Sequence, residues 1–153
     1  MNILSKPLIL LAALMLLMAT PLVVGTAHAT TPGTSSGSIQ IVSSVVTDSR
    51  VAGGNAFYTL TNTATTTGTF TGTLLCDERQ LVMSSGYAVI HDTCVFTGSV
   101  DGHVGTAVLR LSQGHFVDVS GGTGDLANLR GQGTFQVNSD GSGTYSGGFH
   151  FDP

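Results

Sequence analysis

Apolar and polar residues alternate in short runs along the chain from Ser38 to its end. These runs are rich in Val, Ile, Thr, Phe and Tyr, and Gly, Asp, Asn or Ser separates them, which is the pattern of many short antiparallel strands. A sustained 3.6-residue apolar period is missing from this part, and only residues 125–130 look helical, over about one turn. The pattern predicts strands at residues 38–47, 56–63, 67–76, 78–83, 87–97, 105–111, 115–120, 132–138 and 143–151.

Sequential hairpins of this kind, in a chain of this size, predict either a β-sandwich or a closed β-barrel. Glycines recur inside the predicted strands, and small barrels place glycine at their tight bends. The fold class that we predict is therefore all-β, a small antiparallel β-barrel of about eight strands over residues 38–153. The glycines behind this preference are Gly68, Gly72, Gly98, Gly105, Gly133, Gly147 and Gly148.

The N-terminal residues have the parts of an export signal. One cation precedes an apolar run at residues 8–18, and the small residues Ala27 and Ala29 form a cleavage site. We predict a helical signal peptide at residues 1–29, a flexible leader at 30–37, and a secreted product, extracellular or periplasmic, that no longer contacts a membrane. An uncleaved anchor is the alternative, since the apolar stretch approaches the ~20 residues that span a bilayer.

The two cysteines of the chain, Cys76 and Cys94, lie symmetrically about Ser85. A three-residue loop of Ser84, Ser85 and Gly86 places them directly opposite each other in a hairpin, with Gly86 providing the positive φ that such a loop needs. An even number of cysteines in an exported protein indicates a disulfide. A two-cysteine metal site is the alternative, but no nearby Cys or His completes a tetrahedral set.

A second hairpin is predicted within residues 107–119, around a three-residue loop at residues 112–114. This register gathers aliphatic side chains on one face and places Arg110 and Asp118 together on the other. A two-residue loop would mix the two faces, and for this reason we prefer the longer one. The predicted pairs are Leu111 with His115, Leu109 with Val117, and Ala107 with Val119.

The C-terminal third carries the most specific sequence signal. Residues 122–133 read Gly-Thr-Gly-Asp-Leu-Ala-Asn-Leu-Arg-Gly-Gln-Gly, and residues 143–145 read Gly-Thr-Tyr. Both resemble segments shared by an uncharacterised bacterial family with a calycin-like, allene-oxide-cyclase-type barrel. The resemblance covers residues 67–151, and dirigent proteins and allene oxide cyclases are similar more weakly. The family implies a barrel and no established reaction, and its hairpin is longer than the one at residues 111–116, which implies that one rim of this barrel is cut back.

The same segment has structural roles that need no ligand. Asp125 can accept backbone N–H bonds as an N-cap, Leu126 and Leu129 can plug one barrel mouth, and Gly131 can end the turn. A dinucleotide fingerprint is mimicked at residues 122–127, but no βαβ unit follows, so we predict no cofactor. The residues to which we assign structural roles are Cys76, Cys94, Gly122, Gly124, Asp125, Leu126, Leu129 and Gly131.

Charge and polar residues argue against several function classes. The formal net charge is −4, and the only lysine lies in the predicted signal peptide, so nucleic acid is not an expected partner. The neighbours His91 and Asp92 point to opposite faces of a strand and form no dyad. A metal site of His115, Asp118 and His150 has no support from spacing, and we predict none.

Catalytic carboxylates and nucleophiles are not apparent. No serine occupies a Gly-x-Ser-x-Gly elbow. The acidic residues are scattered, mostly beside turn formers, and Glu78 lies in a polar Cys-Asp-Glu-Arg stretch that does not match the catalytic residues of allene oxide cyclase.

Aromatic residues near the C-terminus provide the one candidate ligand site. They either fill the core or line a small apolar cavity. The candidate lining residues are Phe135, Val137, Tyr145, Phe149 and Phe151.

Three hypotheses for function follow. The first is a secreted barrel that binds a small apolar molecule or serves as a non-enzymatic scaffold. The second is a barrel enzyme of cyclase or isomerase type, and the third is a surface adhesion or matrix protein. A dry, aromatic-filled interior favours a scaffold, an open pocket with an inward acid or His favours an enzyme, and a filled barrel with an exposed apolar patch favours adhesion. The sequence leaves the oligomeric state open.

Overall fold

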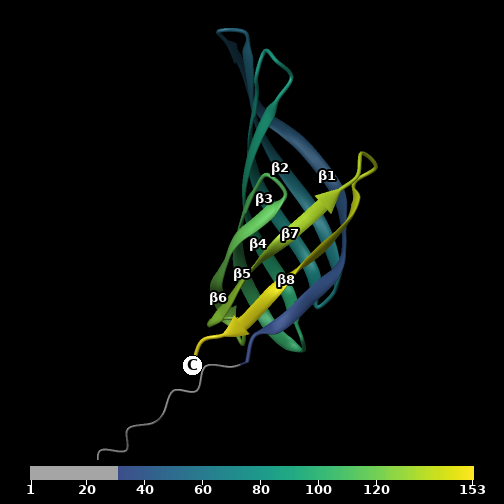
Figure 1. Ribbon diagram of the computed structural model, residues 1–153, viewed down its shortest axis with the longest axis vertical. Helices are drawn as coiled ribbons and strands as arrows, with labels where there is room; N and C mark the ends of the chain where they lie inside the picture. Colours follow the sequence, from purple (N-terminus) through teal and green to yellow (C-terminus); the bar gives the residue numbers. More distant parts are fainter. Residues whose placement is uncertain (1–30) are drawn as a thin grey trace, which may run out of the picture.

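The computed structural model describes residues 31–153, which form a closed antiparallel β-barrel (Figure 1). Its strands follow one another around the wall in chain order, and β8 pairs with β1 to close it. The predicted all-β barrel of about eight strands is confirmed. The predicted signal peptide at residues 1–29 lies outside the described residues. The strands are β1 (Gly33–Ala52), β2 (Asn55–Gly68), β3 (Phe70–Val82), β4 (Ala88–Val100), β5 (His103–Ser112), β6 (His115–Gly124), β7 (Leu129–Val137) and β8 (Ser142–Phe151).

Strand β1 begins earlier than the sequence pattern indicates. Its pairing with β8 starts at Gly33, opposite Phe149, and continues to Gln40, opposite Ser142. The flexible leader predicted at residues 30–37 is therefore wrong from Gly33 onward. These residues are Gly, Ser and Thr, and their composition alone does not predict a strand. They join the wall because the backbone N–H and C=O groups of β8 need a partner strand to close the barrel.

The cysteine hairpin has the predicted register. Cys76 of β3 pairs with Cys94 of β4, and a disulfide joins them across a Cα–Cα distance of 3.9 Å. The loop lies between Met83 and Tyr87, whose backbones are hydrogen-bonded, and Gly86 has a φ of +85°. The disulfide is thus confirmed, and the two strands predicted on either side of Asp77 are one continuous strand, β3.

The second hairpin differs from the prediction. Ser112 pairs with His115, so the loop has only Gln113 and Gly114, both with positive φ (49° and 80°). The predicted three-residue loop is therefore wrong. A β-bulge between Phe116 and Asp118 adds one residue to β6. With this extra residue, the aliphatic side chains and the charged pair again lie on opposite faces, which a two-residue loop alone would not allow. Consequently Arg110 and Asp118 still share the outer face, as predicted, although they are now direct partners, with their charged groups 4.0 Å apart.

The two ends of the barrel differ because its strands have unequal lengths. Strands β1 to β4 rise well beyond β5 to β8 at one end, where the β1–β2 and β3–β4 hairpins project (Figure 1). Strand β8 pairs with β1 only as far as Gln40, and β5 pairs with β4 only as far as His91. Beyond these points the inner face of the long strands has no opposite wall. We call this end the wide mouth, and its rim is low at the β5–β6 hairpin.

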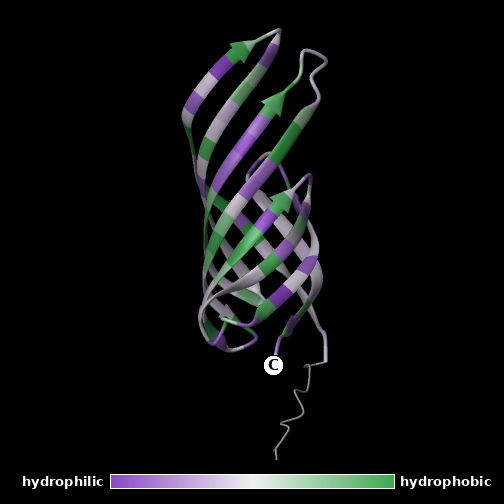
Figure 2. Cartoon of the chain, turned by 90° about the vertical axis from the view of Figure 1, so that its left-hand side faces the viewer, coloured by the Kyte–Doolittle hydropathy of each residue, from purple (hydrophilic) through white to green (hydrophobic). Residues whose placement is uncertain are grey.

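The other end is closed by apolar side chains. Residues alternate between hydrophilic and hydrophobic along the strands (Figure 2), so that each strand contributes one set of side chains to the interior. Phe70 lies at the centre of an aromatic cluster, with its ring 5.5 Å from Phe96, 5.9 Å from Tyr145 and 6.4 Å from Phe149. The completely buried Leu126 lies in the turn between β6 and β7. This closed region is the narrow end.

Glycines make room for the large rings of this core. Gly72 and Gly98 are cross-strand partners, and a Cβ built on either would come within 3.1 Å of the Phe96 ring. Gly133 and Gly147 are likewise partners, and the ring of Phe116 lies against both. The predicted link between strand glycines and barrel closure thus has a packing reason here. Within the part of the chain that the structure describes, no helix has the length and apolar character needed to cross a membrane.

Candidate functional site

A cavity of about 460 Å³ opens at the wide mouth. It exists because β3 and β4 continue upward past the low β5–β6 hairpin, which leaves part of their inner face uncovered. Its size lies within the range of small-molecule sites in proteins. Its apolar wall includes Ile39, Ile41, Ile90, Leu111, Phe135 and Val137.

One side of this cavity is polar. Glu78 of β3 is the cross-strand partner of Asp92 of β4, and Asp92 in turn pairs with the buried Leu111 of β5. Because cross-strand partners share a face, both carboxyl groups point inward. Asn62 of β2 joins them, and its Nδ2 donates a hydrogen bond of 2.6 Å to Glu78 Oε2. We call Asn62, Glu78 and Asp92 the acid cluster.

The acid cluster has unmet hydrogen-bonding capacity. Asn62 is only 8% exposed, yet its Oδ1 has no hydrogen-bond partner, and neither has Oδ1 of Asp92. Burial, and secondly the negative charge of Glu78, raise the pKa of Asp92 from 3.8 to about 7. The mouth therefore contains one carboxyl group that can hold a proton near neutral pH beside a second carboxyl group.

The interior below the mouth is nearly filled. A void of about 40 Å³ lies there, and its mainly apolar lining includes Phe70, Phe96 and Tyr145. The Tyr145 hydroxyl accepts a 2.8 Å bond from the N–H of Phe70 and lies 3.1 Å from the carbonyl oxygen of Thr67, to which it donates. Burial raises the pKa of Tyr145. Inside the barrel, the space at the wide mouth is therefore larger than the space in the aromatic core.

The five residues proposed from sequence to line a cavity do not share one. Phe135 and Val137 border the cavity at the wide mouth. Tyr145 and Phe149 belong to the buried core, and Phe151 lies at the narrow end, where its ring is 4.7 Å from that of His103. Alternation gives these residues a common face of β7 and β8, but each strand runs from one end of the barrel to the other, so residues on that face lie at different heights.

The residues given structural roles in the Gly-Thr-Gly segment lie at the narrow end. Leu126 and Leu129 are completely buried there. Gly124 has a φ of +64°, and a Cβ on Gly122 would meet the carbonyl oxygen of Thr106 at 2.4 Å. Asp125 is exposed, and its backbone N–H donates to the carbonyl oxygen of Val104. Beyond Gly131, β7 continues directly, so no helix follows the apparent dinucleotide fingerprint.

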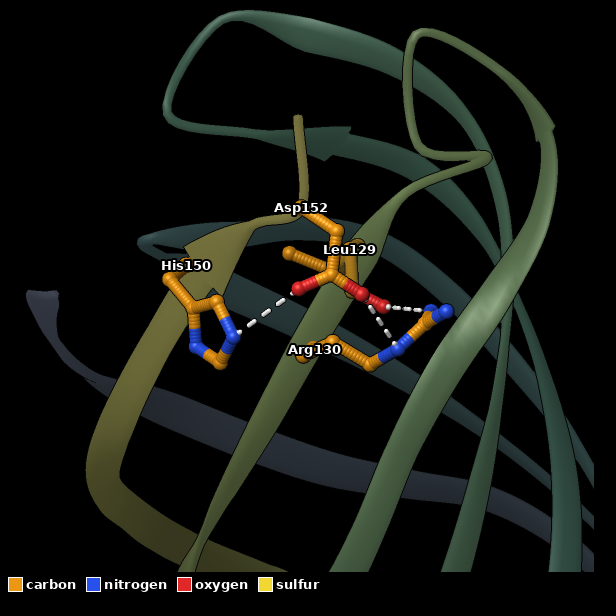
Figure 3. A network of polar contacts seen from close by, with 4 residues as sticks. All are labelled: Leu129, Arg130, His150 and Asp152. Atoms are coloured by element: carbon orange, nitrogen blue, oxygen red, sulfur yellow. Dashed lines mark hydrogen bonds and ion pairs between the residues drawn. The ribbon is translucent and has the colours of Figure 1, made fainter. Parts of the chain in front are cut away.

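A second, open groove of about 960 Å³ lies on the outside, where β6 and β7 pair sparsely. Near the groove, Asp152 links β7 to β8: its carboxylate lies 3.0 Å from Arg130 Nε and 3.2 Å from His150 Nε2 (Figure 3). His115, Asp118 and His150 all border the groove. Nevertheless, within residues 31–153 no three His, Cys, Asp or Glu side chains come close enough to hold a metal ion.

Sequence reasoning missed the acid cluster, although the hairpin register already indicates one part of it, the pairing of Glu78 with Asp92. The register that places Cys76 opposite Cys94 also places Glu78 opposite Asp92, two residues further toward the loop. Since the disulfide lies on the inner face, both acids must do so too. The polar Cys-Asp-Glu-Arg stretch around Glu78 and the scatter of the acids along the chain conceal this pair in the sequence.

Comparison with known proteins identifies the fold and no activity. No protein-family model matches the chain, and no curated protein matches it in sequence. Among solved structures, the barrel is similar to a protein of unknown function from the DUF3224 family of Shewanella oneidensis MR-1, with a TM-score of 0.70 and 17% sequence identity. The match covers 80% of this chain and 100% of that one. At this identity the similarity shows a shared barrel fold alone.

Proposed function

We propose that this protein binds a small, mostly apolar molecule in the wide mouth of its barrel. The observation that carries the proposal is the 460 Å³ cavity, in which an apolar wall faces a few polar side chains. Small-molecule sites have this composition, because apolar surface supplies most of the affinity and a few polar groups fix the orientation.

A purely structural role fits the wide end less well. A scaffold needs a filled interior, and the aromatic cluster around Phe70 provides one only toward the narrow end. At the wide mouth, Asn62 and Asp92 retain oxygen atoms without partners, which is a cost that a scaffold has no reason to keep. Adhesion would use exposed apolar residues, such as Val42 and Val51 of β1, but it would leave the cavity unexplained.

Export and the finer family assignment belong to the same proposal. The disulfide between Cys76 and Cys94 is compatible with an extracellular or periplasmic location. The barrel shared with the DUF3224 protein is compatible with a calycin-like, allene-oxide-cyclase-type relationship. We propose a secreted binding protein of this barrel type.

A barrel enzyme of cyclase or isomerase type is the second candidate. Asp92 favours it, because an inward carboxyl group with a pKa of about 7 can donate or accept a proton near neutral pH. Glu78, its cross-strand partner, would serve as the second carboxyl group of such a site. Binding is the step that the two candidates share, and it can be tested first.

Nile red, a neutral dye that fluoresces in apolar surroundings, tests the proposal. We expect saturable binding at one site per chain. Ile90→Trp fills the mouth with a larger side chain and should weaken binding about tenfold or more. Val89→Trp is the matched control, because Val89 is the adjacent residue and points to the outer face. Non-saturable binding, or equal losses in both variants, would contradict a ligand site at the mouth.

A further inference from the structure

The acid cluster brings three hydrogen-bond acceptors to one side of the mouth. Glu78 and Asp92 are direct partners on β3 and β4, and Asn62 lies diagonally on β2, bonded to Glu78 through its Nδ2. That bond fixes the amide, so that its carbonyl oxygen is the part left to interact with something else. Asn62 Oδ1 and Asp92 Oδ1 both lack a partner.

An unpaired oxygen on a side chain as buried as Asn62 is unusual. With 8% of its surface exposed, Asn62 has little access to water, and leaving a buried acceptor without a donor destabilises a protein measurably. A ligand that brings N–H donors would satisfy Asn62 and Asp92 together. A ligand with only acceptor atoms would not.

The charge of the cluster also lacks a counterpart. The residues that line the cavity include no Lys, Arg or His. On the strands that carry or flank the acids, the register places the cations on the outer face: Arg79 and His91 pair with each other on β3 and β4, and Arg110 of β5 is exposed. Tyr58 of β2 lies on the inner face in the row above the acids, and His103 of β5, the partner of the buried Val100, lies at the opposite, narrow end.

We propose that the acid cluster binds the ammonium group of a small primary amine whose apolar body lies against the opposite wall of the mouth. This inference rests on the proposed function and adds the chemical class of the ligand. A primary ammonium has three N–H donors and one positive charge, which match the three acceptor side chains and their negative charge. The apolar body would contact Ile41, Leu111 and Phe135.

The arrangement also gives selectivity. A neutral molecule of the same shape leaves the carboxyl charge uncompensated, and an anion is repelled by it. Hydrogen bonds between charged groups are stronger than neutral ones, so the ammonium should improve affinity over a hydroxyl by about tenfold or more.

Isothermal titration calorimetry at pH 8 with three probes of equal chain length tests the proposal: n-octylamine, 1-octanol and n-octanoate. We expect the purified protein to bind octylamine about tenfold or more tightly than octanol, and octanoate most weakly. Glu78→Gln keeps the side-chain shape and an acceptor for Asn62 but removes one of the two carboxyl charges, so it should reduce octylamine affinity about tenfold while octanol binding stays within about twofold.

Asp77→Asn is the matched control, because it removes one negative charge from the adjacent, exposed position of β3. Octylamine affinity that is equal to octanol affinity, or equally reduced in Glu78→Gln and Asp77→Asn, would overturn the amine proposal. The proposed function would still stand in that case if both octylamine and octanol bind to the parent protein and Ile90→Trp abolishes the binding of both. If neither octylamine nor octanol binds and Nile red binding does not saturate, both proposals are wrong.

Discussion

Replacing Asp92 with Asn should stabilise the folded protein above pH 7 and leave its stability near pH 4 almost unchanged. The pKa of Asp92 rises from 3.8 to about 7 on folding, because burial and the charge of Glu78 disfavour the ionised form. A group whose pKa is raised on folding contributes no penalty below its unfolded pKa, where both states hold the proton. The penalty develops as pH rises from about 4 to about 7 and is complete above that range.

The expected magnitude follows from the size of the shift. A shift of about three pKa units corresponds to about 4 kcal/mol if it acted in full. The carboxyl group is only partly buried, however, and water screens its interactions. We therefore expect Asp92→Asn to gain about 1–2 kcal/mol in the free energy of unfolding at pH 8 relative to pH 4.

Urea denaturation of both proteins at pH 4, 5.5, 7 and 8.5 measures this difference. The difference between variant and parent should grow across this series and level off above pH 7. Asp77→Asn, on the outer face of β3, controls for the general effect of losing one negative charge. If the gain in stability were the same at pH 4 and pH 8.5, the pKa of Asp92 would not be raised on folding, and the reasoning would be refuted.

Three further changes test the packing of the barrel. Replacing Cys76 and Cys94 with Ser should lower the free energy of unfolding by about 3 kcal/mol, because the disulfide joins residues 18 apart in sequence. Tyr145→Phe should cost about 1–3 kcal/mol, because the buried N–H of Phe70 loses its acceptor. Phe96→Ala should cost about 3–5 kcal/mol, because its ring is completely buried. Chemical denaturation measures all three.

Each of these changes has a comparison within the molecule. Adding a reductant to the parent protein should reproduce most of the loss caused by the cysteine replacement. Tyr87→Phe removes an exposed hydroxyl that accepts from Gln113, so it should cost much less than Tyr145→Phe. Val95→Ala alters the outward neighbour of Phe96 and should have little effect. Equal losses within either of these last two pairs would contradict the assigned core.

The sequence by itself determined the strand pattern, the fold class and the cysteine hairpin. Each of these depends on short-range information. Alternation defines a strand over a few residues, and the position of Cys76 and Cys94 about Ser85 sets a register that a single loop can enforce.

Other features depended on residues far apart in the chain. The polar segment from Gly33 to Gly37 became a strand only because β8 offers it a partner. After the tight turn at Gln113 and Gly114, β6 can keep an apolar inner face and a polar outer face only because a β-bulge follows the turn. The alternation of residues along the chain predicts neither the early start of β1 nor the bulge in β6, because both depend on pairing with another strand.

The acid cluster depends on both kinds of information, the local hairpin register and the contacts between distant strands. The hairpin register alone places Glu78 opposite Asp92. Only the closed barrel decides that this face is the inside, that Asn62 reaches Glu78, and that β5 ends at Ser112 and leaves the acids at an open mouth. Burial and an unpaired hydrogen-bond acceptor are properties of the whole surrounding wall, and for this reason the tertiary structure had to reveal the site.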